Sequence, residues 1–311
     1  MRVLVTGARG FVGSNVARVF AEHHGAEVLG PSHAELDVTD GDAVRRHVGA
    51  AAPDAIVHCA ILNDPARLSS DRRRAWEAYV GATRHLVDAA NATGAQLLLV
   101  STDWVFDGTR PHATEDEPPC PINPYGFLKA ASELVVSERA ERATVARISG
   151  VNGVHWGARD VPRAQDAGFG YLVAALVQAL RAGRRFRLWE GPGLNAIATP
   201  TLASEAAELF WRALERGVTG ILHCCGAEAV DRAELARRTV AAFELDPELL
   251  ESGPPPAGAL PAVPVPRDTS LDGTATARAL GTDLLDLDGL LAGLRHELDT
   301  GAPATAQRSA T

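Results

Sequence analysis

The sequence has few of the residues that stabilise small secreted or metal-dependent folds. Only four cysteines occur among its 311 residues, at positions 59, 120, 224 and 225, and no two of them are spaced as C-x-x-C. A disulfide framework and a structural zinc site are therefore not expected. The ten histidines include no H-x-x-x-H pair, so a catalytic zinc ion has no support either. We predict no metal site.

The chain is also short of positive charge and of long apolar runs. It carries 30 basic and 39 acidic residues, a net charge of -9, which argues against nucleic-acid binding and against a polybasic membrane anchor. No apolar run approaches the length of a membrane span, and Met1 leads directly into a strand-like segment. We expect a cytoplasmic protein with a substantial core, because 46% of the residues are hydrophobic.

What is present begins with a strand, a glycine turn and a helix in that order. An apolar strand at residues 3–5 runs into Thr-Gly-Ala-Arg-Gly-Phe-Val-Gly at residues 6–13, and a helix follows as far as Gly25. Glycines at such a turn let the backbone approach a pyrophosphate, whose charge then lies on the free N–H groups of the helix start. We therefore predict a dinucleotide site. Its expected contacts in this turn are Gly7, Arg9, Gly10, Phe11, Val12 and Gly13.

The next two strands predict the rest of the dinucleotide site. The second strand ends in Gly-Pro-Ser-His without a carboxylate, so Ser32 and Arg9 are free to contact a 2'-phosphate, which favours NADPH over NADH. Asp37 and Val38 would lie beside the adenine, although Asp37 is explained nearly as well as an ordinary turn residue. The end of the third strand should pass under the cofactor. Its expected backbone contacts are Cys59, Ala60 and Ile61.

Strands and helices alternate along the first half of the chain. That alternation predicts a parallel sheet with helices on both faces, a doubly wound Rossmann-type α/β fold. We expect a dinucleotide-binding domain at residues 1–150, a smaller substrate-binding region at 151–299 that is partly interleaved with the sheet, and a disordered tail at 300–311. Continuous helices are predicted from Arg72 to Asn91 and from Gly168 to Arg181.

A second group of reactive residues surrounds the helix that begins near Pro124. Asn123 followed by Pro124 is a helix-start signal, so Tyr125 falls in the first turn and Lys129 lies one turn later on the same face. A neighbouring ammonium group and the positive end of a helix both favour phenolate. We therefore expect the pKa of Tyr125 to be lowered, which would make it a usable general acid or base.

Thr102 is the expected partner of this phenol. Residues 96–100 form an apolar run of strand length, so Thr102 would emerge at the carboxyl end of the strand, where parallel sheets bind ligands. A hydroxyl group there could hold the oxygen of a substrate carbonyl. The spacing Tyr-x-x-x-Lys also arises by chance on amphipathic helices, so the cofactor turn is what favours a catalytic reading.

These motifs resemble the extended short-chain dehydrogenase/reductases over nearly the whole chain. The glycine turn is similar to the cofactor turn of that family, and Thr102, Tyr125 and Lys129 are similar to its catalytic triad. Within the family, residues 35–40, 101–108 and 124–129 are similar to the dTDP-4-dehydrorhamnose reductases. The resemblance implies an oxidoreductase that uses NADPH, with NADH not excluded, to reduce the 4-keto group of a nucleotide-linked deoxysugar.

The resemblance also implies roles for single residues. Tyr125 and Lys129 would contact the cofactor as well as the substrate, and Asp103 and Trp104 would contact the substrate. Tyr79 stands where the family usually has an asparagine, so the proton relay is expected to differ. Trp104 also stands where related 4,6-dehydratases carry a glutamate base, which argues against dehydration.

Two other functions fit the same motifs. A nucleotide-sugar epimerase that retains NAD would use the same triad, and the regulatory subunit of methionine adenosyltransferase resembles this branch while acting mainly as a partner protein. The expected partner is a nucleotide sugar, and a homodimer is left open. Its diphosphate would bind either to a basic cluster or near Arg147 or Arg267, whereas the cluster could instead be ordinary solvated cations. The cluster consists of Arg181, Arg184, Arg185 and Arg187.

Overall fold

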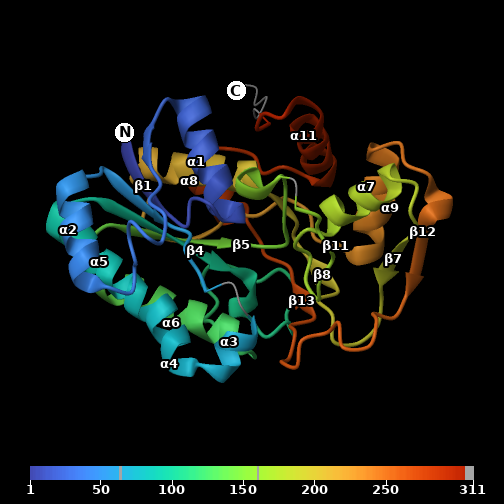
Figure 1. The fold of residues 1–311 in the computed structure, drawn as a ribbon, viewed down its shortest axis with the longest axis horizontal. Coiled ribbons are helices and arrows are strands. Elements are labelled where there is room, and N and C mark those ends of the chain that lie inside the picture. The colour runs from blue at the N-terminus through green and yellow to red at the C-terminus, as the bar shows by residue number, and fades with distance from the viewer. Residues whose placement is uncertain (63–64, 160, 305–311) are drawn as a thin grey trace.

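A computed structural model describes residues 1–62, 65–159 and 161–304 of the chain. Its centre is a six-stranded sheet in which every neighbouring pair of strands is parallel (Figure 1). The strand order is β10 (Gly220–His223), β5 (Ala143–Ile148), β4 (Gln96–Thr102), β3 (Ala55–His58), β1 (Arg2–Thr6) and β2 (Glu27–Leu29). The chain reverses direction across the sheet between β1 and β3, and open α/β sheets bind ligands at the carboxyl ends of the strands on either side of such a reversal.

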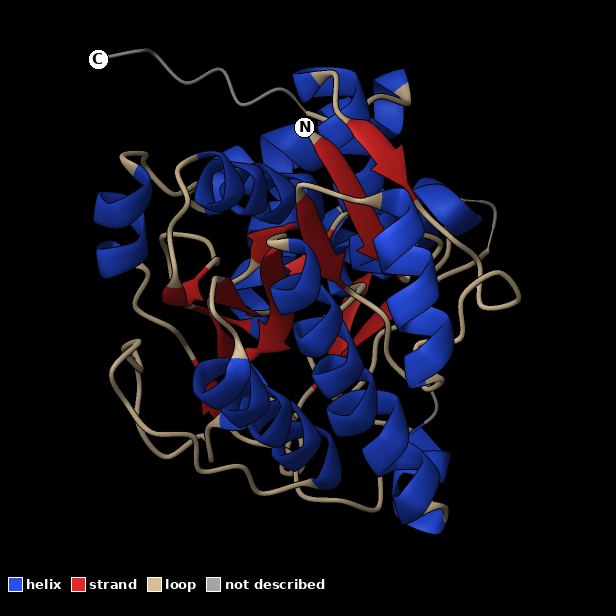
Figure 2. Ribbon diagram, turned by 90° about the vertical axis from the view of Figure 1, so that its left-hand side faces the viewer, coloured by secondary structure: helices blue, strands red, loops and turns tan. Residues whose placement is uncertain are grey.

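Helices cover both faces of this sheet, as Figure 2 shows. One face carries α2 (Gly41–Ala51), α5 (Ala82–Thr93) and α6 (Pro124–Arg139), and the other carries α1 (Phe11–His24) and α8 (Ala203–Glu215). Side chains of a strand alternate between faces, so in β4 Leu97 and Leu99 join the first core and Leu98 and Val100 the second. The predicted doubly wound Rossmann-type fold is confirmed.

A smaller region follows β5 and has a core of its own, with Leu176, Leu235 and Leu291 at its centre. Its helical segments are η3 (Trp156–Ala158), α7 (Leu172–Arg181), α9 (Arg232–Ala242), η4 (Pro247–Leu249) and α11 (Leu287–Thr300). Its strands are β6 (Val151–Asn152), β7 (Phe186–Trp189), β8 (Ile197–Ala198), β9 (Thr201–Leu202), β11 (Val230–Asp231), β12 (Leu250–Gly253) and β13 (Asp268–Thr269). Because β10 and α8 return to the main sheet, the two regions are interleaved. The domain boundary at residue 150 stays a prediction.

Two predicted helices differ from those in the structure. The helix expected from Arg72 to Asn91 consists of α4 (Arg72–Trp76), a π-helical turn η1 (Glu77–Gly81) and α5, which ends at Gly94 in a left-handed cap. Tyr79 in this π-turn is buried and packs with residues of α4 and α6. The helix expected from Gly168 begins only at Leu172, because the Gly168 N–H donates to the Asp166 side chain in a local turn instead.

The remaining elements lie at the edges of the fold. The two other helices are α3 (Pro65–Ser70), which packs near α6, and α10 (Thr274–Leu280), which packs on the sheet core. Residues 254–266 contain six prolines and form neither helix nor strand. None of the helices in the described part of the chain has the length and apolar character needed to cross a bilayer.

The carboxyl terminus is more ordered than expected near residue 300. Gly301 ends α11 in a left-handed cap, Pro303 is buried, and the Ala304 N–H donates to Glu297 Oε1 at 3.3 Å. The expectation of disorder from residue 300 is therefore wrong for residues 300–304, because the chain folds back to satisfy a buried carboxylate. The rest of the predicted tail lies outside the described residues.

Candidate active site

The glycine turn between β1 and α1 is shaped by close backbone contacts. Gly7 has a φ of +71°, and a Cβ atom there would lie 2.7 Å from the Ala60 nitrogen. A Cβ atom on Gly13 would lie 2.2 Å from the Gly7 carbonyl oxygen. Such distances exclude any side chain, so glycine is required at both positions. The same contact brings the end of β3 against the turn, where Cys59 and Ala60 were predicted to lie.

The start of α1 fits a phosphate group. Gly10 is the N-cap, so no side chain covers the first N–H groups of the helix, and the first turn has no acidic residue. Arg9 and Gly10 are exposed, while Phe11 and Val12 are half-buried. The positive end of the helix dipole therefore faces an open surface next to the turn, as binding of a dinucleotide pyrophosphate requires.

The predicted 2'-phosphate site contains a carboxylate that the sequence reading missed. The Ser32 N–H and hydroxyl both donate to Glu35 Oε2 at 2.7 Å. Hydrogen bonding from Ser32, helped by the charge of Arg9, lowers the pKa of Glu35, so the carboxylate is ionised. The prediction that this end of β2 has no carboxylate is therefore wrong. The turn after β2 brings Glu35, three residues further along the chain, back onto Ser32.

The other predicted adenosine contacts differ in how well they fit. Asp37 Oδ1 accepts from both the N–H and the hydroxyl of Thr39, which is the ordinary turn role that competed with a cofactor role. Val38 packs against the core of the main sheet. Ile61 is 42% exposed just beyond β3. Their contacts with a cofactor stay predictions.

Tyr125 lies half-buried in the first turn of α6, as predicted. Asn123 caps the helix by accepting from the Gly126 N–H at 2.9 Å. The phenol ring stands between two other aromatic rings, Tyr79 and Trp104, each with its centroid 6.2 Å away and nearly perpendicular to it. These edge-to-face contacts fix the orientation of the ring.

Lys129 lies on the same helical face but does not act on Tyr125 as expected. Its Nζ donates to the Val100 carbonyl oxygen at 2.8 Å and lies 5.6 Å from the centroid of the Tyr79 ring. Burial lowers the pKa of Lys129 to about 8. Burial also raises the pKa of Tyr125 to about 12, against the lowering effect of a hydrogen bond with Thr102. The predicted fall in the pKa of Tyr125 is therefore wrong, because desolvation outweighs the lysine and the helix dipole.

Thr102 and Asp103 form a buried hydrogen-bonded unit at the end of β4. The Thr102 hydroxyl donates to Asp103 Oδ1 at 3.0 Å and accepts from the Trp104 N–H at 3.2 Å. Asp103 Oδ2 accepts from the Ser149 hydroxyl at 2.8 Å, and burial raises the pKa of Asp103 to about 6. Both Asp103 oxygens are thus engaged within the protein. Within the protein this side chain holds Thr102, and the substrate contact of Asp103 stays a prediction.

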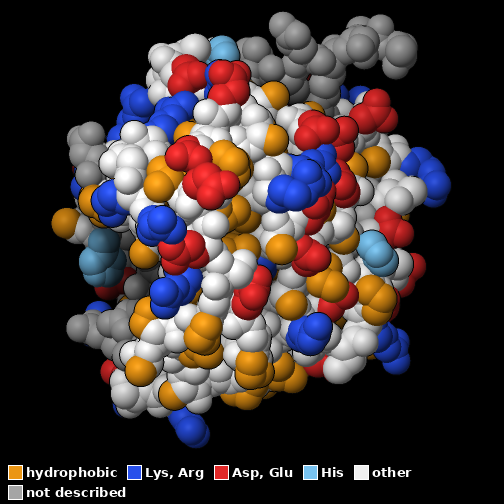
Figure 3. Space-filling view, turned by 90° about the vertical axis from the view of Figure 1, so that its right-hand side faces the viewer, with side chains coloured by type: hydrophobic (Ala, Val, Ile, Leu, Met, Phe, Trp, Pro, Cys, Tyr) orange, Lys and Arg blue, Asp and Glu red, His pale blue; other side chains and the backbone are white. Residues whose placement is uncertain are grey.

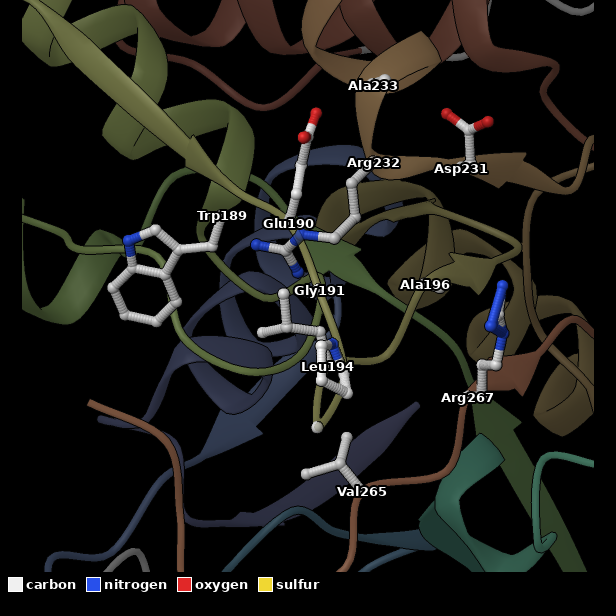
Figure 4. Close-up of a pocket in the computed structure, with 12 residues that line it drawn as sticks. Trp189, Glu190, Gly191, Leu194, Ala196, Asp231, Arg232, Ala233, Val265 and Arg267 are labelled. Carbon is white, nitrogen blue, oxygen red and sulfur yellow. The ribbon is translucent and has the colours of Figure 1, made fainter. Parts of the chain in front are cut away.

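A pocket of about 540 Å³ lies in the second region and is linked to Tyr125 by a series of side-chain and backbone contacts. Trp104 connects the two, because it contacts Tyr125 on one side and approaches Gly168 on the other, and the Gly168 carbonyl accepts from Arg232 at the pocket wall. Figure 4 shows Trp189 and Arg267 on opposite sides of the pocket. Its apolar lining includes Leu194 and Val265, and its acidic rim consists of Glu190 and Asp231.

The predicted basic cluster does not line this pocket. Arg185 and Arg187 both approach the carboxylate of Glu251, and Arg181 pairs with Asp299 at 3.2 Å. Figure 3, which faces this side of the molecule, shows acidic and basic side chains interleaved rather than a continuous basic patch. The solvated-cation reading of the cluster fits these contacts.

The two alternative arginines are placed very differently. Arg147 is fully buried and pairs with Glu133 at 2.8 Å, so it cannot reach a substrate. Arg267 is exposed and lies at the pocket. Of the arginines singled out in the sequence, Arg267 is thus the one that the structure places at the pocket.

Comparison with known proteins agrees with this geometry. The sequence profile of the family described as the RmlD substrate binding domain matches residues 1–292. The chain belongs to this family. It is 30% identical over 257 residues to the dTDP-4-dehydrorhamnose reductase of Mycolicibacterium smegmatis, which covers 79% of this chain and 71% of the relative.

Two further comparisons extend the family assignment. The chain is 28% identical over 250 residues to the methionine adenosyltransferase 2 subunit beta of Rattus norvegicus, covering 78% and 72% of the two chains. The crystal structure of the Bacillus anthracis dTDP-4-dehydrorhamnose reductase in complex with NADP has the same fold, with a TM-score of 0.78 at 21% identity over 95% of this chain and 99% of that one.

Membership of the RmlD family confirms the resemblance read from the motifs, but several site residues lay outside those motifs. Arg232 begins α9, is buried, and donates to the Gly168 carbonyl and to Gln165. Trp189 and Val265 reach the pocket from β7 and from the proline-rich segment. No short pattern marks them, because their positions depend on how the second region folds onto the sheet.

Proposed function

We propose that this RmlD-family protein reduces a keto group on a nucleotide-activated deoxysugar, as a dTDP-4-dehydrorhamnose reductase does. NADPH is the proposed hydride donor, with NADH as an alternative. The observation that carries the proposal is the position of Tyr125, which meets Thr102 at the carboxyl end of β4. Contacts through Trp104, Gly168 and Arg232 link it to a pocket that contains Trp189 and Arg267.

The roles of the reacting residues follow from their geometry. The bound dinucleotide supplies the hydride. Because the pKa of Tyr125 is raised to about 12, the phenol is protonated near neutrality and can donate its proton to the oxygen of the carbonyl as negative charge develops there. Thr102 is held by Asp103 and positions the same oxygen. Lys129 is fixed on the Val100 carbonyl one helical turn after the phenol, and its proposed role is to contact the bound dinucleotide.

The substrate class rests on the pocket and on the relatives. A volume of about 540 Å³ lies within the range of small-molecule sites. The indole ring of Trp189 can stack against a nucleotide base, and the planar guanidinium group of Arg267 can donate hydrogen bonds to phosphate oxygens. The relative that is 30% identical is named for a nucleotide-sugar substrate, and a more distant family structure contains NADP. The predicted cytoplasmic location and a role in deoxysugar biosynthesis belong to the same proposal.

The decisive experiment compares oxidation of NADPH with dTDP-linked 4-keto sugars by the wild type and by Tyr125→Phe. Phenylalanine keeps the ring contacts with Tyr79 and Trp104, so we expect kcat to fall by about 10²–10⁴-fold while the Kd for NADPH is unchanged. Tyr79→Phe is the matched control, because its hydroxyl bonds only to the Leu62 carbonyl among the described residues, and it should stay active. Equal rates for wild type and Tyr125→Phe would contradict the assignment.

The methionine adenosyltransferase relatives make a non-catalytic role the natural competitor. The chain retains Thr102, Tyr125 and Lys129 at the end of β4 and on the first turns of α6, which argues for catalysis. The competitor predicts no turnover of any keto sugar and co-purification with a synthetase. An epimerase that retains NAD predicts cofactor bound on purification.

A further inference from the structure

A second pocket, of about 410 Å³, lies between the loop that carries η3, the end of α7 and the end of α11. Its polar lining includes three arginines, Arg159, Arg163 and Arg181, together with His155, whose pKa is lowered by burial and by the charge of Arg163. Its apolar wall includes Val177 and Leu298. No aspartate or glutamate occurs among the described residues that line it.

Most of this positive charge has no ion-pair partner among the residues that the structure describes. Arg181 pairs with Asp299, but neither Arg159 nor Arg163 has an ion pair with any described residue. Their guanidinium groups lie over the rings of Trp156 at 5.1 Å and Tyr171 at 4.8 Å. Arg163 also donates from one guanidinium nitrogen to the Ala158 carbonyl at 2.8 Å, which leaves its other N–H groups for a ligand. In the described chain His155 Nδ1 is buried without a hydrogen-bond partner. A buried polar atom of this kind is costly unless a ligand or water satisfies it.

The pocket adjoins the cofactor turn through aromatic contacts. The His155 ring stacks on Phe11 with centroids 5.9 Å apart, and Phe11 also packs against Tyr171 at 4.6 Å. Trp156 Nε1 donates to Asn15 Oδ1 on α1 at 2.9 Å. In Figure 1 the η3 segment accordingly lies against α1. Residues that would hold an anion are therefore packed on the helix that begins at the glycine turn.

We propose that this pocket binds a small organic anion, a phosphate or carboxylate on an apolar body, and that its occupancy alters the affinity of the neighbouring cofactor turn for the dinucleotide. The guanidinium groups of Arg159 and Arg163 bind the anionic head, and the wall formed by Val177 and Leu298 covers the apolar part. The binding is separate from the reductase reaction, while the coupling rests on the proposed dinucleotide site.

Calorimetric titration tests the binding. Phenyl phosphate and benzoate are the two anionic probes, and benzyl alcohol is the uncharged one. Each is titrated into the intact protein in the presence of excess NADPH, which blocks the dinucleotide site. We expect an anion to bind at one site per chain and the alcohol not to bind. The Arg159→Gln/Arg163→Gln double variant should weaken that binding at least tenfold, because both cationic partners are lost.

Two control variants make the result decisive. Arg163→Lys keeps the charge and should bind the anion better than the double variant, whereas Arg184→Gln removes an exposed arginine that does not line the pocket and should leave binding unchanged. Failure of both anions to bind, or equal binding by the wild type and the double variant, overturns the site.

The coupling is measured as the Kd for NADPH with and without the anion. A change in the wild type that disappears in the double variant supports it, since linkage requires the two ligands to affect each other reciprocally. An unchanged Kd overturns the coupling while leaving the anion site intact. Anion binding is read without turnover, so an inactive reductase would leave this result unaffected.

Discussion

Among single residues, Asp103 gives the clearest dependence on pH. Its carboxyl has a pKa of about 6 in the folded chain against a reference value of 3.8, so the folded state binds the proton more tightly. The free energy of unfolding therefore falls, by on the order of 3 kcal/mol in total, as the pH rises from about 4 through 6. Below pH 4 the carboxyl is protonated in both states and this loss is absent. Relative to wild type, Asp103→Asn should gain stability between pH 4 and pH 7.5.

Unfolding in denaturant at both pH values measures this difference. Asp107→Asn is the control of opposite sign, because hydrogen bonds from Thr109 lower the pKa of Asp107 and that contribution is lost as the pH falls. The control should therefore lose stability relative to wild type as the pH rises. An Asp103→Asn difference that is the same at both pH values rules out the assigned burial of charge.

Glu35 bears on the choice of cofactor. Its carboxylate occupies the Ser32 N–H and hydroxyl that a 2'-phosphate would use, and it would repel that phosphate while accepting from a ribose hydroxyl. Glu35→Gln should therefore tighten binding of NADPH several-fold and weaken binding of NADH. Dissociation constants measured by fluorescence titration for the two cofactors provide the test, and a parallel change in both would show that Glu35 does not discriminate.

At the scale of elements, the start of α6 carries more than a helix cap. Asn123 accepts from the Gly126 N–H, and its Nδ2 donates to the Pro264 carbonyl at 3.1 Å. Asn123→Ala should cost about 1 kcal/mol for the cap and should also lower kcat, because the helix turn that carries Tyr125 loses its anchor. Asp40→Ala removes the cap of α2 only and should match the loss of stability without the loss of rate.

Thermal unfolding and steady-state kinetics separate the two effects. If Asn123→Ala keeps the wild-type kcat, as Asp40→Ala is expected to do, the anchor has no part in the reaction. The contrast also shows what the sequence can predict about an element. The cap of α6 is predictable because Asn-Pro acts locally, whereas no local pattern marks the π-turn at Tyr79, whose ring packs against side chains of α4 and α6.

For the whole molecule, the sequence predicts the sheet well because strand and helix periodicity decides which faces are buried. The dinucleotide turn and the position of Tyr125 follow from the same local rules. The pocket does not, since Trp189, Arg232 and Val265 come from three separate segments of the second region. Electrostatic environment is equally non-local, which is why the direction of the pKa shift of Tyr125 was wrong.

The proline-rich segment at residues 254–266 joins the two halves of the site. Val265 lines the pocket, and the neighbouring Pro264 carbonyl is held by Asn123 at the start of the helix that bears the phenol. A substrate in the pocket would therefore contact the same proline-rich segment that is hydrogen-bonded to the start of the Tyr125 helix. Removing the nucleotide from the substrate should therefore lower kcat as well as raise KM, because remote binding energy is used at the reacting carbonyl. Kinetics with the free 4-keto sugar test this prediction. An unchanged kcat would mean that the proline-rich segment contributes to substrate binding only.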